Sequence, residues 1–268
     1  MNAIQSILVH LDASPHSAVR LQVARAVAAR FGAAVTALYA VTPVSVQMAS
    51  AMVVGSANDA LYALDQERLA AARKLVAAGG GEPAVQFAEA QDAPESAFVR
   101  QALYADLLVL GQRDRDQPGS GVLPDFAQSV LIASGRPALL VPYIAARPSR
   151  METVFVAWKE SREAARALTA ALPWLRAAKA VHVGIAAGEA DKAPLQQYLQ
   201  RHGVAAECHT LVAEPAQAGE MILSMAADVG ADLMVMGCYG HSRARELVLG
   251  GASRTVLDSM TVPVLMAH

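Results

Sequence analysis

The sequence predicts an α/β protein built from two tandem copies of a doubly wound unit with a five-stranded parallel sheet. Two observations carry this prediction. Apolar runs of strand length alternate with amphipathic stretches of helix length, and the whole pattern occurs twice along the 268 residues. Strand–helix alternation implies right-handed crossovers, which place the strands parallel and cover the sheet with helices.

An internal repeat is visible directly in the letters. "LLVLGQRDRDQPGSG" begins at residue 107 and "LMVMGCYGHSRAREL" at residue 233, so that Gly111 matches Gly237. Pro137 matches Pro263 at the same separation of 126 residues. Two anchors at one spacing indicate that the second half of the chain repeats the first.

The two copies differ by an insertion. Their opening segments, residues 6–18 and 153–165, overlay at a separation of 147 residues, so the first copy carries 21 additional residues (147 − 126). We place the insertion at about 42–60, where small and polar residues break any periodic pattern, and expect a loop or lid there.

Each copy is expected to contain five strands and the helices between them. The polar, proline-containing stretch 146–150 is the predicted link, giving domains at 1–146 and 151–268. Expected strands are 6–11, 33–41, 84–90, 106–111 and 137–143 in the first copy, then 153–158, 180–187, 205–213, 232–237 and 262–268. Apolar residues recur at helical spacing in 16–30, 59–78, 95–104, 162–178, 194–202 and 215–229, and a last helix is expected at 252–260.

Composition narrows the class of protein. A hydrophobic content of 54%, a charged content of 17% and a net charge of −2 are typical of a globular chain. No apolar run reaches the roughly 20 residues that cross a bilayer, and Asp12 interrupts the first apolar run, so we expect a cytoplasmic protein without a membrane partner. The near-zero charge disfavours nucleic-acid binding, and two cysteines, Cys208 and Cys238, are too few for a disulfide framework.

The stretch "GCYGHSRARELVLGGAS", residues 237–253, has a spacing suited to phosphate binding. Gly237, Gly240 and Gly250 form the pattern G-x2-G-x9-G at the end of the fourth expected strand, followed by Gly251 and Ser253. Glycines let an anion approach the backbone, and the following helix begins with free amide groups whose dipole favours negative charge. The Ser253 hydroxyl could add a donor.

His241 and two arginines within this stretch add positive charge that a phosphate could use. The stretch matches neither the dinucleotide fingerprint nor the Walker motif. The alternative interpretation is a turn in which the glycines serve only the backbone conformation.

The repeated five-strand unit, together with "MGCYGHSRARELVLGGASRTVL" and "VLMAH", resembles the universal stress protein family over nearly the whole chain. The resemblance implies a Rossmann-like sheet with strand order 3-2-1-4-5 and pairing of the two domains through their last strands, as an internal pseudo-dimer. In members that keep the glycine loop, it further implies ATP held there by its phosphates. An acidic residue after the first strand usually contacts the nucleoside in those members.

Carried over to this chain, the resemblance makes the second copy the phosphate binder. Two positions depart from the family pattern: Gly251 stands where serine or threonine is common, and Lys159 stands where the nucleoside-contacting aspartate falls. A lysine has no acceptor for a ribose hydroxyl but can donate to a phosphate. Trp158 beside it could cover an adenine or serve only in packing.

The first copy departs in the opposite way. Asp12 is present, whereas Asp114, Pro124, Asp125 and Ala127 occupy the positions of Gly240, Gly250, Gly251 and Ser253. Carboxylates at a phosphate site repel an anion. We therefore expect the nucleotide, ATP or a related anion, in the second copy only.

Other polar residues are expected to be structural. His10 and Asp12 share a strand face and could form an acid–base pair, but Asp12 as a helix cap is favoured. His182, His202, Cys208 and His209 fall on different expected elements without a ligand spacing, so no metal site is expected. Cys238 could be a redox-sensitive thiol or a small turn residue.

We expect a regulatory nucleotide-binding protein of the stress response, not a metabolic enzyme, with at most slow ATP hydrolysis. The sequence shows no nucleophile, base and orienting group together. Further homo-oligomerisation and protein partners are expected. The alternative is a scaffold or small-ligand protein that acts through protein partners without a nucleotide.

Overall fold

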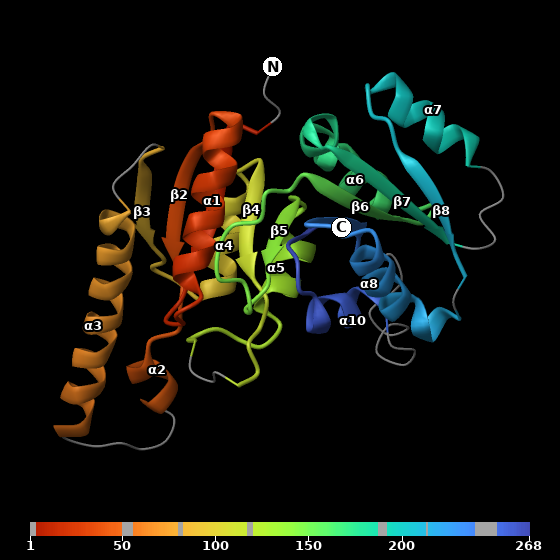
Figure 1. Ribbon diagram of the computed structural model, residues 1–268. Helices are drawn as coiled ribbons and strands as arrows, with labels where there is room; N and C mark the ends of the chain where they lie inside the picture. Colours follow the sequence, from red (N-terminus) through yellow and green to blue (C-terminus); the bar gives the residue numbers. More distant parts are fainter. Residues whose placement is uncertain are drawn as a thin grey trace. The chain divides into compact units, whose positions relative to one another are not determined.

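The computed structural model describes residues 4–49, 56–79, 83–116, 120–186, 192–212, 214–238 and 251–268 (Figure 1). The chain divides into two compact units, Met1–Ser134 and Gly135–His268. None of the helices within the described ranges is long and apolar enough to cross a membrane.

The first unit is a parallel sheet in the order β3-β2-β1-β4. Its strands are β1 (Ser6–Leu11), β2 (Ala34–Tyr39), β3 (Val85–Glu89) and β4 (Leu107–Gly111). Five of the six residues of β1 are buried, because the strand lies in the middle of the sheet and is covered on both faces.

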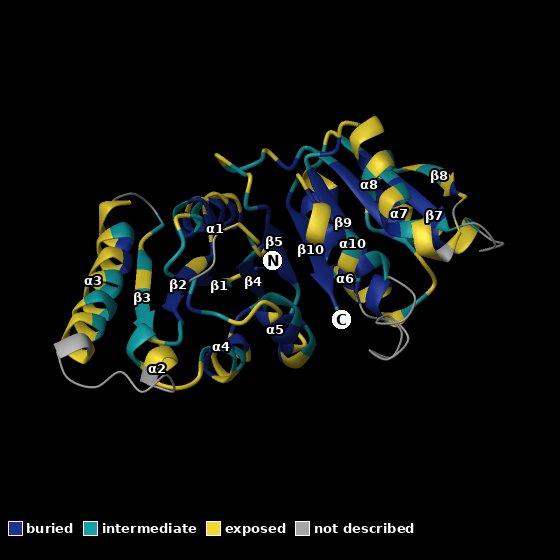
Figure 2. Ribbon diagram, turned by 90° about the horizontal axis from the view of Figure 1, so that it is seen from below, coloured by how far each residue is buried: buried dark blue, intermediate teal, exposed yellow. Residues whose placement is uncertain are grey.

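Helices cover both faces of this sheet. They are α1 (Ser17–Phe31), α2 (Val44–Ala49), α3 (Ser56–Ala78), α4 (Pro94–Ala102) and α5 (Phe126–Ser134). Figure 2 shows α1 on one face, with α4 and α5 side by side on the other. Helix α1 ends at Gly32, whose positive φ of 70° lets its N–H bond to the carbonyl of Ala28.

The second unit has the strand order β5-β10-β9-β6-β7-β8. These strands are β5 (Ala138–Val141), β6 (Thr153–Trp158), β7 (Ala180–Ala186), β8 (Glu207–Leu211), β9 (Leu233–Gly237) and β10 (Val264–Ala267). All pairs are parallel except β5 with β10, which is antiparallel. The last strands of the two sequence copies are therefore neighbours, as the family resemblance implies.

The helices of the second unit follow the same plan. Within the described ranges they are α6 (Arg162–Ala177), α7 (Ala193–Arg201), the 3-10 helix η1 (Pro215–Gln217), α8 (Ala218–Asp228) and α10 (Ala252–Ser259). Helix α6 packs on β6, β9 and β10, and α8 packs on α10. Ser161 caps α6 by accepting a hydrogen bond from the amide of Ala164 at 3.1 Å.

The predicted fold class is confirmed: both copies are α/β units with parallel strands in the doubly wound order. The insertion differs from expectation, because α2 and the start of α3 lie within 42–60, where a loop was expected. Asp65 of α3 accepts hydrogen bonds from the amides of Val44 and Ser45, at 2.7 and 3.1 Å, which satisfies the start of α2. Residues 50–55 lie outside the described ranges.

The pairing of β5 with β10 leads to a prediction about the stability of the protein. Leu140 is only 1% exposed and lies opposite Val264, so Leu140→Ala should lower the free energy of unfolding by about 2–5 kcal/mol through lost burial and a cavity. Leu103→Ala, at a position 53% exposed, should lower it by less than about 0.5 kcal/mol. Urea unfolding followed by circular dichroism would measure both, and equal effects would contradict the burial of β5.

Candidate functional site

The ends of the first and fourth strands of each copy are neighbours. Val9 pairs with Val109 in the first copy, and Ala157 pairs with Met236 in the second. The chain winds in opposite directions from these strand pairs, and ligands of doubly wound sheets bind in the crevice at such a point, outside the carboxyl ends.

In the second copy, the predicted residues on β6 and β9 meet at this edge. Trp158 is the last residue of β6 and is half-buried, the adjoining Lys159 is exposed, and Gly237 is the last residue of β9. Because Ala157 pairs with Met236, Trp158 and Gly237 come one step later on neighbouring strands.

Gly237 is held to glycine by the start of α6. A Cβ at this position would lie 2.6 Å from the carbonyl carbon of Glu163 and 2.8 Å from the Cα of Ala164. These are backbone atoms of a helix, which cannot move aside as a side-chain end can. Gly237 therefore permits α6 to pack closely against β9.

Helix α10 begins at the other end of the predicted loop. Gly251 is its N-cap residue and gives no side-chain cap hydrogen bond, while Ser253 in the first turn is 5% exposed. Gly240, His241 and Gly250 lie outside the described residues. The grouping of all eight predicted residues into one site therefore stays a prediction.

Glu163 is a buried carboxylate that the sequence analysis missed. It lies in the first turn of α6, with its side chain 4% exposed and paired with Arg162. Burial raises its pKa, but hydrogen bonds from Arg162 and its own backbone amide outweigh this and lower the pKa. The amino terminus of α6 is thus already supplied with a negative charge.

Cys238 continues the pairing of β9 with β10. Its amide donates to the carbonyl of Ala267 at 3.0 Å, and its thiol lies 3.4 Å from the same oxygen. The side chain is 1% exposed. A thiol so buried is poorly placed to react with an oxidant, which favours the structural interpretation.

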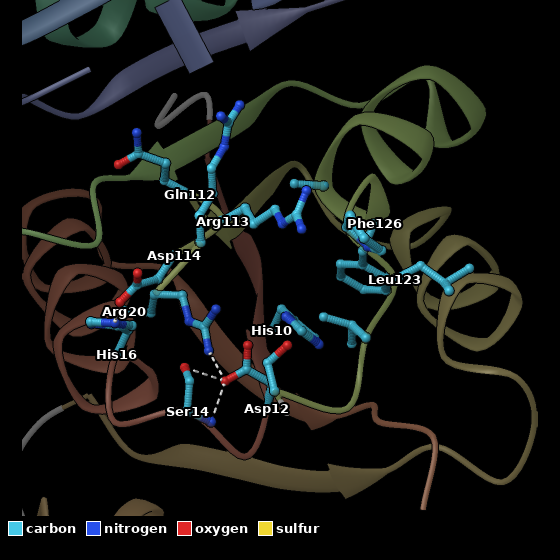
Figure 3. Close-up of a pocket in the computed structure, with 16 residues that line it drawn as sticks. His10, Asp12, Ser14, His16, Arg20, Gln112, Arg113, Asp114, Leu123 and Phe126 are labelled. Atoms are coloured by element: carbon cyan, nitrogen blue, oxygen red, sulfur yellow. Dashed lines mark hydrogen bonds and ion pairs between the residues drawn. The ribbon is translucent and has the colours of Figure 1, made fainter. Parts of the chain in front are cut away.

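The first copy contains a pocket of about 260 Å³ at the equivalent edge (Figure 3). Residues from the end of β1, the start of α1 and the segment that follows β4 line it. The sequence predicted a site only in the second copy, because Asp114 and Asp125 were expected to repel an anion. Asp114 lines the pocket, whereas Asp125 is exposed and does not.

The negative charge of Asp12 is balanced by Arg20 within this pocket. Its Oδ1 accepts from Arg20 Nη2 at 2.6 Å and from the amide and hydroxyl of Ser14 at 2.9 and 2.6 Å (Figure 3). Asp12 and Arg20 are 7% and 4% exposed. Burial raises the pKa of Asp12, but the Arg20 guanidinium holds it well below its usual range. Asp12 is not the helix cap expected from the sequence, because His16 is the N-cap residue of α1 and no side chain caps that helix; Asp12 instead orders the turn that precedes α1.

Other charges in the pocket are mixed. Asp114 pairs with His16 at 2.9 Å, and Arg113 and Arg115 also line the cavity. The carboxylate of Asp114 thus shares the pocket with two guanidinium groups, a balance that the repulsion expected from the sequence did not include.

His10 is a buried, neutral ring in the same pocket. Its Nε2–H donates to the carbonyl of Ala40 at 2.9 Å, and the ring lies 4.3 Å from that of Phe126. Burial, helped by the charge of Arg20, lowers the pKa of His10 to about 4. His10 therefore contributes packing and a hydrogen bond, not the acid–base pair considered above.

The candidate metal ligands are partly brought together. His182 on β7 and His209 on β8 lie on different strands, as expected, but the strands are neighbours and the nitrogens His182 Nδ1 and His209 Nε2 are 3.1 Å apart. His202 instead lies beside Arg176. Glu207, which the sequence analysis did not consider, joins the two histidines.

Comparison with known proteins now assigns the chain to a family. The model of the universal stress protein family matches residues 3–142 and 153–268. The chain therefore belongs to the universal stress protein family and contains two tandem copies of its domain.

Individual relatives agree with this assignment. The universal stress protein Slr1230 of Synechocystis sp. is 37% identical over 70 residues, 26% of this chain and 23% of that protein. The chain thus spans about a quarter of that relative's length. A universal stress protein from Archaeoglobus fulgidus matches 98% of this chain and 95% of its own with TM-score 0.72 and 18% identity.

A Pseudomonas aeruginosa protein of unknown function is similar in fold as well. It matches over 99% of this chain and 93% of its own, with TM-score 0.61 and 18% identity. At this level of sequence identity, the similarity shows a shared fold and nothing more.

The two matched glycines should tolerate alanine differently. Gly237→Ala should lower the free energy of unfolding by about 1–3 kcal/mol, because its Cβ meets the backbone of α6. At Gly111 the nearest obstacle is Nη1 of Arg20, whereas Nη2 makes the bond to Asp12, so the side-chain end can turn with this bond retained and Gly111→Ala should cost less. Thermal unfolding of both variants measures this, and an equal or reversed order would contradict the tight contact at Gly237.

His10 should make stability depend on pH. The folded state keeps His10 neutral down to about pH 4, whereas the unfolded chain takes up the proton near pH 6.5, so acid favours unfolding between these values. Between pH 7 and 4.5 the protein should lose about 2 kcal/mol more stability than the His10→Gln variant. Urea unfolding of both proteins at each pH tests this, and equal slopes would contradict a buried, neutral His10.

Proposed function

We propose that the second copy binds an anionic nucleotide, ATP being the first candidate, along residues 237–253, and that binding regulates the protein in the stress response. The observation that carries the proposal is the glycine spacing between the end of β9 and the amino terminus of α10. The chain's family membership supports it.

The two helix termini near this edge differ in what they offer an anion. Glu163 already supplies a carboxylate to the amino terminus of α6. Gly251 supplies no side-chain cap to α10, so the amides there suit an external phosphate. Ser253 lies in the same turn.

The two copies also differ in charge at matched positions. Asp12 and Arg20 of the first copy correspond to Lys159 and Ala167 of the second. The second copy thus lacks the internal ion pair of the first, and the exposed Lys159 can donate to a phosphate where the family's aspartate contacts the nucleoside. This exchange favours recognition through the phosphates.

The proposed role is regulatory. The hydroxyl of Ser161, which follows β6 at this edge, is already engaged as the cap of α6. The nearby carboxylate of Glu163 is paired with Arg162. Neither group forms part of a nucleophile and base arrangement, so the proposal requires binding and no more than slow hydrolysis.

Equilibrium binding of labelled ATP tests the proposal. Gly240→Asp imitates Asp114 of the first copy and should abolish saturable binding, because it places bulk and negative charge in the loop. Lys159→Met should weaken binding by about tenfold, corresponding to about 1.4 kcal/mol for one charged hydrogen bond.

Lys179→Met is the matched control, since Lys179 is an exposed lysine in the same unit that pairs with Glu152. It should bind ATP as the unmodified protein does. Absence of saturable binding by the unmodified protein would rule out ATP as the ligand. Unchanged binding of ATP by Gly240→Asp would show that residues 237–253 are not part of the ATP site.

A further inference from the structure

We propose that His182, Glu207 and His209 form a binding site for zinc or a similar divalent transition metal on the outer strands of the second unit. No part of this site coincides with residues 237–253. It is therefore independent of the nucleotide proposal.

Strand register brings the three side chains to one face. In the parallel pair β7–β8, His182 lies opposite Glu207 and Gly184 lies opposite His209. Side chains alternate between faces along a strand, so residues 207 and 209 project to the same side, and their partners on β7 do so too. Gly184, opposite His209, has no side chain, and Phe155 and Leu211 fill the space where one would stand.

The donor atoms of the three side chains lie within 4.8 Å of one another. His182 Nδ1 lies 3.1 Å from His209 Nε2 and 3.4 Å from Glu207 Oε2, while His209 Nε2 lies 4.0 Å from Glu207 Oε1. In a tetrahedral zinc site with ligand bonds of about 2.0–2.1 Å, donor atoms are about 3.3 Å apart. Two of the three separations match that value, and a rotation of the exposed glutamate supplies the third.

The donor set suits zinc in its chemistry. Two imidazoles and one carboxylate are ligands that zinc prefers, and three protein ligands leave a fourth position for water or another molecule. The carboxylate offsets part of the metal's charge. Without a metal, the two facing nitrogens can share only one proton in a single hydrogen bond.

The two histidines are largely buried, whereas the glutamate is exposed to solvent. The histidine side chains are 18% and 24% exposed, whereas that of Glu207 is 68% exposed. Phe155, fully buried, and Leu211 pack closely beside Gly184 and form an apolar floor. Strand β8 is the last strand of the sheet order (Figure 1), and the exposed side chain of Glu207 brings the cluster to solvent.

Cobalt titration of the full chain, freed of metal by a chelator, tests the proposal. Cobalt(II) reports tetrahedral nitrogen and oxygen ligands through its visible absorption. One equivalent should give this spectrum, and zinc should displace it. Glu207→Gln keeps the shape of the side chain, is tolerated at an exposed position and should weaken binding at least about tenfold, since even outer partners of metal ligands contribute 10–100-fold.

The double variant His182→Gln/His209→Gln should lose the cobalt spectrum, and His202→Gln, outside the cluster, should keep it. Zinc should raise the melting temperature of the unmodified protein by more than that of Glu207→Gln, because a ligand of the folded state stabilises it according to its affinity. Absence of a saturable cobalt spectrum in the unmodified protein would overturn the proposal. Binding that survives in the double variant would do so too.

Discussion

Parallel pairing of the first and fourth strands in each copy is the constraint on which the rest of the structure depends. β1 pairs with β4, and β6 pairs with β9. Parallel neighbours require crossover helices, and right-handed crossovers carry the chain away from this pair in opposite directions. Strand ends and helix amino termini therefore meet at the carboxyl edge, where the pocket of the first copy lies and where the nucleotide of the second is proposed.

The same edge carries different electrostatics in the two copies. The first copy buries Asp12 against Arg20, and the arginine occupies space beside Gly111. A buried ion pair is retained only with good geometry and additional hydrogen bonds, which Ser14 provides. The second copy has Lys159 and Ala167 at these positions. Duplication thus preserved the backbone while the side chains at the edge diverged, which is consistent with separate roles for the two copies.

Much of the fold and part of the site could be predicted from the sequence. The expected strands at 6–11 and 153–158 coincide with β1 and β6, because continuous apolar runs buried on both faces leave a strong local signal. Helix α2 was missed: six residues are too short for a clear period, and Asp65 stabilises the helix from another element. The Arg20–Asp12 pair was also missed, since an arginine within a helical pattern is normally exposed.

The amino-acid order therefore settled the duplication, most of the strand and helix segments and the glycine spacing, since each is a property of neighbouring residues. Tertiary structure decided which distant groups meet. His182 and Glu207 are separated by a helix and become neighbours only through the register of β7 on β8. Likewise, burial keeps His10 neutral, and the neighbouring guanidinium of Arg20 keeps Asp12 charged. Both results depend on distances and solvent exclusion, which a linear pattern does not encode.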